Sequence, residues 1–221
     1  MQMLSADIFS KSAFHYKKQF EFILKQLTAC YYSMLNDYQT IENNENTIRN
    51  RLNKDYLNNN QVIEKLGLIE FFFDIESPEI NDLYEEEGRT DIKIYNVNER
   101  MHDKSAYYIM ECKRLDGNKA LNREYIRKGI QRFVDKKYPS YYQLNGMLGF
   151  IVKKIDIHKN IRKINLLIKQ EYPETNTTSN LKNSNFIKDF NYSYISMHSD
   201  STEVDIELYH IMWDFHKLIA G

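Results

Sequence analysis

Residues 146–152, GMLGFIV, constrain the fold more than any other part of the chain. An uninterrupted apolar run of this length is typical of a central β-strand that is buried on both faces. Such a strand requires a sheet with covering elements on its two sides. Only seven glycines and three prolines occur among 221 residues, which favours long regular elements. We therefore predict an α/β protein with a mixed sheet flanked by helices.

The N-terminal part of the chain predicts one long helix over residues 11–40. Apolar side chains recur there at three- and four-residue steps, which marks one helical face. This face is expected to pack in the core or to form a dimer seam. We predict an N-terminal helical extension over residues 1–40 and one α/β domain over residues 41–221. The face consists of Phe20, Ile23, Leu24, Leu27, Tyr31, Met34, Leu35 and Tyr38.

The remaining elements alternate between helices and strands. A second helix carries Ile48, Leu52 and Tyr56 on one face, and an acidic, turn-rich loop covers residues 76–88. We predict polar loops at 96–105 and 173–189, the second of them mobile. We predict a strand, or a short helix leading into one, at 67–74. We predict strands at 91–95, 106–113, 146–152 and 192–198, helices at 119–137 and 155–170, and an apolar closing segment at 204–215.

Charge is distributed unevenly although the net charge is only −1. Residues 37–90 contain 13 acids against 5 Lys and Arg, whereas residues 118–169 contain 13 Lys and Arg against 3 acids. One surface that holds cations and another that holds a polyanion would explain this division, as would two solvated faces that pair with each other.

Several protein classes are disfavoured by the sequence. No apolar run approaches 18 residues, so we predict no transmembrane helix and no membrane partner. The N-terminus lacks the pattern of a signal peptide. Cys30 and Cys112 are far apart and lack metal-ligand spacing, which predicts reduced thiols and a cytoplasmic location.

Three charged residues lie in two neighbouring predicted strands. Glu111 and Lys113 share one strand face, and Asp91 lies beside them if the register of the hairpin brings its side chain to that face. Two converging carboxylates favour a divalent cation such as Mg²⁺, and the backbone carbonyl of Cys112 adds another oxygen. Glu45 projects from the second helix as a further ligand. The alternative is a cross-strand ion pair on a solvated sheet face.

These residues resemble the motif of the PD-(D/E)XK, or restriction-endonuclease-like, nuclease superfamily. The matching segments are GRTDIKI with Asp91, YYIMECKRL with Glu111 and Lys113, and ENTIRNRLNKDYL with Glu45. The resemblance spans roughly residues 40–215 and implies an α-β-β-β-α-β core. Thr90 stands where the motif has proline, and Glu42 competes with Glu45 for the helix-borne acid. The C-terminal segments are similar to a bacterial subgroup whose function is mostly unassigned.

The resemblance implies a Mg²⁺- or Mn²⁺-dependent nuclease acting on DNA, in defence or repair. Asp91, Glu111, the Cys112 carbonyl and Glu45 are then the expected metal ligands, and Lys113 the expected catalytic cation. Two alternatives remain open, a nuclease-fold protein that binds without cutting and an interaction subunit that dimerises through the first helix or joins a larger system. The expected nucleic-acid contacts are Arg89, Arg127, Gln131, Arg132 and His198.

Overall fold

The computed structural model describes residues 6–80, 86–104, 106–136, 143–200 and 202–220. Seven strands form one mixed sheet in the order β1-β2-β3-β4-β7-β6-β5. The pairs β3–β4 and β4–β7 are parallel, and the other neighbours are antiparallel. The strands are β1 (Phe71–Ile80), β2 (Glu86–Asn96), β3 (Tyr108–Leu115), β4 (Leu144–Ile151), β5 (Thr177–Asn183), β6 (Ser193–Ser199) and β7 (Asp205–Asp214).

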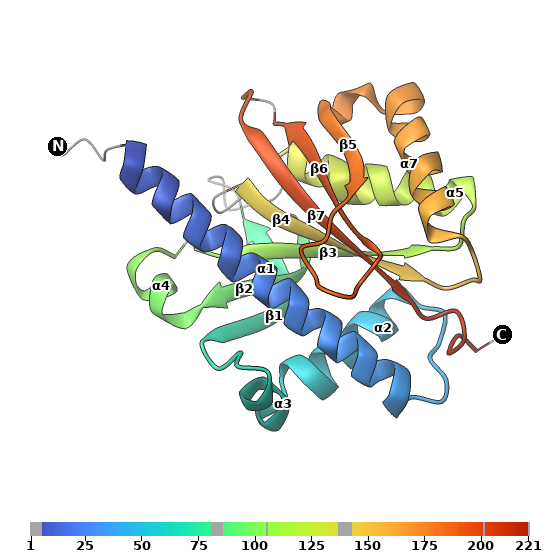
Figure 1. Ribbon diagram of the computed structural model, residues 1–221, viewed down its shortest axis with the longest axis horizontal. Coiled ribbons are helices and arrows are strands. Elements are labelled where there is room, and N and C mark those ends of the chain that lie inside the picture. Colours follow the sequence, from blue (N-terminus) through green and yellow to red (C-terminus); the bar gives the residue numbers. More distant parts are fainter. Residues whose placement is uncertain (1–5, 81–85, 105, 137–142, 201, 221) are drawn as a thin grey trace.

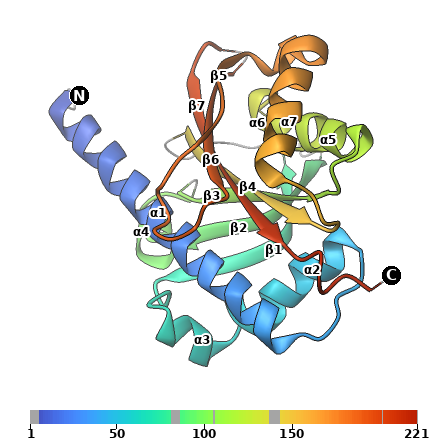
Figure 2. The same ribbon diagram turned by 45° about the vertical axis from the view of Figure 1, so that its right-hand side comes forward.

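Helices cover both faces of this sheet, as the sequence predicts. The long helix α1 crosses one face, and α5 and α7 lie together on the other (Figures 1 and 2). The α-helices are α1 (Ala6–Asp37), α2 (Glu45–Leu52), α3 (Asn60–Lys65), α4 (Val97–His102), α5 (Lys119–Tyr125), α6 (Gln131–Val134) and α7 (Ile157–Glu171). The described residues also form two π-helical turns, η1 (Asn53–Leu57) and η2 (Ile126–Ile130), and one 3-10 turn, η4 (Pro173–Thr175).

The central strand β4 divides the core into two hydrophobic clusters. All of its residues are buried. Leu148 and Phe150 join the cluster under α1, whereas Met147 and Ile151 join the cluster under α5 and α7. Side chains of a strand alternate between faces, so an uninterrupted apolar run can serve both clusters at once. The prediction of a doubly buried central strand is confirmed.

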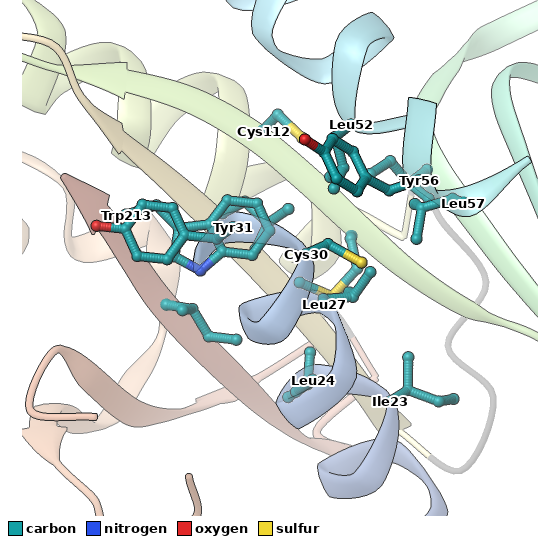
Figure 3. Packing of buried hydrophobic residues seen from close by; sticks show 14 of the residues in the cluster. Ile23, Leu24, Leu27, Cys30, Tyr31, Leu52, Tyr56, Leu57, Cys112 and Trp213 are labelled. Carbon is teal, nitrogen blue, oxygen red and sulfur yellow. The ribbon is translucent and has the colours of Figure 1, made fainter. Parts of the chain in front are cut away.

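The apolar face of α1 packs in the core. Ile23, Leu24 and Leu27 are fully buried against the sheet, and Tyr31 stacks on Trp213 with ring centroids 5.4 Å apart (Figure 3). The helix predicted as an extension is therefore a layer of the main fold. Of the two roles expected for its apolar face, the structure places it in the core.

Three predicted loops contain regular structure instead. Residues 96–105 include α4, because the Asn96 side chain accepts hydrogen bonds from the backbone N–H groups of Asn98 and Glu99 and caps the helix. The segment expected to be a mobile loop at 173–189 includes β5, an edge strand that buries only Leu181 and therefore has a polar sequence. The acidic segment 76–88 includes the end of β1 and the start of β2, and its residues 81–85 lie outside the described ranges.

The longer β2 changes the position of Asp91. This residue was expected to open its strand, but β2 begins at Glu86 and Asp91 lies in its middle. The first half of β2 has the sequence EEGRT, which lacks the alternation of apolar and polar residues that predicts a strand. The sequence therefore does not indicate that the strand begins before Asp91.

Cys112→Ser is expected to lower the free energy of unfolding by about 1–3 kcal/mol, because it places a hydroxyl among apolar side chains. Cys112 is fully buried, and its side chain belongs to the cluster under α1 (Figure 3). Urea denaturation of the two proteins measures the difference. Cys112→Ala is the matched control, since it removes the sulfur without adding a polar group. A serine variant as stable as the wild type would contradict this placement of the thiol.

Candidate functional site

The ammonium group of Lys113 is the centre of a cluster of oxygen atoms. Its Nζ lies 2.5 Å from the carbonyl oxygen of Cys112 and 2.7 Å from Oε1 of Glu111. Oε1 of Glu45 and Oδ2 of Asp91 are 3.3 Å and 3.5 Å away. The residues predicted as metal ligands therefore surround one positive charge. Lys113 is 7% exposed and Glu111 is fully buried, so water screens these interactions little.

The register of the β2–β3 hairpin brings Asp91 to this cluster. The ladder pairs Ile92 with Met110, and both side chains join the cluster under α1. Asp91 and Glu111 are the next residue on each strand and face the opposite side of the sheet. Oδ2 of Asp91 accepts a hydrogen bond of 2.8 Å from the backbone N–H of Cys112. The carboxylate thus accepts a hydrogen bond from the backbone of β3. The register therefore brings the side chain of Asp91 to the same sheet face as Glu111 and Lys113.

Glu45 reaches the cluster from the first turn of α2. Asn44 caps this helix through a bond from the Thr47 N–H, which fixes the direction of Glu45. Oε2 of Glu45 accepts a 2.9 Å hydrogen bond from the backbone N–H of Arg114, while Oε1 faces Lys113. The competing acid Glu42 accepts a bond from the Thr47 hydroxyl instead. Of the two candidate acids, Glu45 lines the cavity described below.

Two arginines that the sequence analysis did not assign to the acids complete the network. Arg49 is 2% exposed and donates to Asp91 and to Glu76 through its two terminal nitrogens. Arg132, expected only to touch nucleic acid, donates to Oε1 of Glu111 over 2.9 Å. Arg49 follows Glu45 by four residues, so both lie on one face of the helix. That spacing was the available signal for Arg49.

Burial and charge shift the ionisation of this network. Burial, with a smaller contribution from the charge of Asp91, raises the pKa of Glu111 to about 7, against the opposing effect of Lys113 and Arg132. Burial would lower the pKa of Lys113, but Glu111, Asp91 and Glu45 outweigh it and raise that pKa above its ordinary value. Lys113 is thus a fixed cation at neutral pH, whereas Glu111 titrates near neutrality.

The cluster opens into a cavity of about 270 Å³. Its wall carries five acids and five bases, so the charges balance. Arg89 and Lys128 stand on this wall in addition to the residues above. The full lining is Glu45, Asn46, Arg49, Glu76, Arg89, Thr90, Asp91, Glu111, Lys113, Glu124, Lys128 and Arg132.

Of the five residues expected to contact nucleic acid, two line the cavity and three do not. Arg89 and Arg132 line the cavity. Arg127 is exposed on η2 outside the lining. Gln131 donates to the carboxylate of Asp135 over 2.7 Å and also lies outside the lining. Four-residue steps along α5, η2 and α6, at Glu124, Lys128 and Arg132, reach the cavity instead.

His198 does not line the cavity and belongs to a buried polar chain. The hydroxyl of Tyr125 lies 2.7 Å from Nδ1 of His210, and the Ser196 hydroxyl lies 2.7 Å from a ring nitrogen of both His210 and His198. Nδ1 of His198 donates to the carbonyl of Thr175 over 2.9 Å. His198 was expected to line the cleft, and the structure places it fully buried and outside the lining of this cavity.

The oxygen atoms of this cluster suit a hard divalent cation, although in this structure the three carboxylates surround the ammonium group of Lys113. Three carboxylates and one carbonyl supply only oxygen, the ligand type of Mg²⁺ and Mn²⁺. As placed here, the described residues include no group of three or more His, Cys, Asp or Glu arranged to hold a metal ion. A metal that used these ligands would have to take the position that the ammonium group holds.

Comparisons with known proteins identify no relative of this chain, so the function must be argued from the geometry of the site. No family model, no curated protein and no solved structure matches this chain. Within the part of the chain that the structure describes, none of the helices has the length and apolar character needed to cross a membrane.

The buried histidines are expected to make stability depend on pH. Burial lowers the pKa of His198 to about 4, so between pH 6.5 and pH 4 the unfolded chain takes up a proton that the folded chain excludes. Stability contributed by the neutral ring is present above pH 6.5 and is lost as pH falls through this window, by about 3 kcal/mol at most for this residue.

Urea denaturation at pH 7.5 and pH 4.5 on the wild type and on His198→Gln measures this dependence. The variant is expected to lose less stability on acidification. His15→Gln is the matched control, since the side chain of His15 is 67% exposed. Equal losses in the wild type and in His198→Gln would contradict the assignment.

Proposed function

We propose that this protein is a divalent-metal-dependent phosphodiesterase of the PD-(D/E)XK type that cuts nucleic acid, with DNA as the favoured substrate. The observation that carries the proposal is the convergence of Asp91, Glu111, Glu45 and the Cys112 carbonyl on one ammonium group. The order α2, β1, β2, β3, α5, β4 also agrees with the α-β-β-β-α-β core that the resemblance implies.

Asp91, Glu111 and the Cys112 carbonyl would hold Mg²⁺ or Mn²⁺, with Glu45 as a further ligand. The metal would polarise a phosphate and lower the pKa of a bound water. Such a metal requires an ionised Glu111, and the double positive charge of the ion would itself favour that state. Lys113, displaced from the carboxylates, would then be available to orient the attacking water or to stabilise the charge that develops on phosphorus.

The rim of the cavity suits a phosphodiester backbone. Arg89, Lys128 and Arg132 line it, and backbone phosphates supply the sequence-independent part of nucleic-acid binding. Arginine presents a planar fork that matches phosphate oxygens. Arg132 would exchange its bond to Glu111 for one to phosphate when a metal neutralises that carboxylate.

A second candidate function is nucleic-acid binding without cleavage. The favouring observation is that Lys113, Arg49 and Arg132 already neutralise the acids of the network. A fold can keep such a network for stability alone. Cleavage assays separate the two functions, because only the first requires a divalent metal.

Lys113→Ala is expected to lower Mg²⁺- or Mn²⁺-dependent nicking of a supercoiled plasmid by at least about 100-fold, because the cation that orients the attacking water and stabilises the developing charge is lost. Gel electrophoresis with each metal, and with chelator, measures it. Lys169→Ala is the matched control, since Lys169 is an exposed lysine at the end of α7. Nicking that survives Lys113→Ala at the wild-type rate would reject the proposed site. Metal binding without any nicking by the wild type would favour the second function.

Lys113→Met is also expected to destabilise the metal-free protein by about 3–5 kcal/mol, because Glu111 is left buried without its closest cation. Mn²⁺ should then raise the unfolding temperature of the variant more than that of the wild type, since the ion replaces the missing charge. Differential scanning fluorimetry with and without Mn²⁺ measures both effects. Lys128→Met, on the half-exposed rim, should show neither. Equal Mn²⁺ shifts in wild type and Lys113→Met would contradict a shared cation position.

A further inference from the structure

Arg49 holds the side of Asp91 that faces away from the Lys113 ammonium group. Its Nη1 donates to Oδ1 of Asp91, and its Nη2 donates to Oε1 of Glu76. The other carboxylate oxygen, Oδ2, accepts the Cys112 N–H and faces Lys113. Each oxygen of Asp91 therefore has its own cation, one on each side of the carboxylate.

This division bears on how many metal ions the site can take. In two-metal phosphodiesterases the ions lie about 3.5–4 Å apart and act on the attacking and leaving oxygens. A carboxylate that bridges such a pair must present one oxygen to each ion. Here Oδ2 of Asp91 can turn to an ion that displaces Lys113, whereas Oδ1 is covered by the Arg49 guanidinium.

Arg49 is not easily displaced from this position. Arg49 is 2% exposed and lies on the buried side of α2, together with Ile48 and Leu52. A guanidinium group is protonated at any pH at which the protein works, and this one donates to the carboxylates of both Asp91 and Glu76. Arg49 also donates to Oδ1 of Asn50, so an incoming ion would leave the buried guanidinium with that neutral partner and without its two carboxylates, which is strongly unfavourable. Lys113 differs, because its compact ammonium group ends a flexible stem, whereas the planar guanidinium of Arg49 is fixed between two carboxylates.

Glu76 shows where a second ion would otherwise bind. Its side chain is 45% exposed and lines the same cavity as Asp91. Without Arg49 the two carboxylates would stand on one cavity wall with no guanidinium between them, and together they would offer oxygen ligands to a hard cation. The guanidinium fills that position with a permanent single charge.

We propose that Arg49 restricts this site to one divalent metal ion by occupying, between Asp91 and Glu76, the position of the second. This inference rests on the proposed function, since it assumes a first ion among Asp91, Glu111 and Glu45. Arg49 is a positioning residue in this scheme, because it acts on Asp91 and on the metal count and does not touch the substrate. In two-metal phosphodiesterases the second ion stabilises charge on the reacting phosphate. In this protein that positive charge must come from side chains of the rim, such as Arg132.

The number of bound Mn²⁺ ions tests the inference without an activity assay. Isothermal titration calorimetry counts the ions, and electron paramagnetic resonance distinguishes an isolated Mn²⁺ from a spin-coupled pair. The wild type is expected to bind one ion with an uncoupled spectrum. Arg49→Met should bind two with a coupled spectrum, and Arg49→Met combined with Glu76→Gln should return to one. Arg123→Met is the matched control, since that arginine pairs with Glu171 on the surface.

The outcomes separate this inference from the proposed function. A wild type that binds no Mn²⁺ would overturn both. Two coupled ions in the wild type would overturn the role of Arg49 and leave the proposed function standing. A single ion in folded Arg49→Met would do the same. If Arg49→Met does not fold, the wild-type count and spectrum still decide the matter, because the inference requires one isolated ion there.

Discussion

The buried ammonium group of Lys113 is the interaction on which the site depends. Glu111 is fully buried, and a carboxylate in that position is costly unless a cation lies against it. Lys113 supplies that cation on the same strand face, two residues away. Asp91 and Glu45 then come from two other elements to the same charge. The first turn of α2 and the inner parts of β2 and β3 are thereby held together by one shared cation.

The sheet makes this arrangement possible by separating apolar and charged faces along the same strands. On β3, Met110 and Cys112 pack under α1, while Glu111 and Lys113 face the side covered by α5 and η2. Gly129 of η2 stands close to Lys113 and Met147, and a Cβ added there would lie 2.3 Å from the Met147 methyl group. The missing side chain leaves room for the Met147 methyl group where η2 packs on the strands, and Arg132, three residues further on, reaches Glu111.

Much of the fold and the centre of the site follow from local sequence pattern. The GMLGFIV segment predicts the doubly buried strand, and the spacing of Glu111 and Lys113 predicts their shared face. The register that aligns Asp91 with Glu111 is a long-range property, so the sequence left it conditional. Arg49 and Glu76 were missed for the same reason, because they meet only when α2 and β1 pack beside β2. The polar sequence of β5 predicts a loop, because an edge strand need not be apolar and so lacks the pattern of a strand.

The π-helical turn η2 explains why the basic helix presents one row of side chains to the cavity. Glu124, Lys128 and Arg132 follow one another at four-residue steps, and all three line it. In a regular α-helix of 3.6 residues per turn, each such step rotates the side chain onward, and two steps carry it well off the first direction.

A π turn contains more residues, so four-residue steps stay aligned across Ile126–Ile130. The aligned row sets cations beside acids on a wall whose charges balance. Under the proposed function, a phosphate entering a neutral cavity gains little from electrostatics until a divalent ion gives that cavity a net positive charge. Metal dependence would then arise in substrate binding as well as in the chemical step.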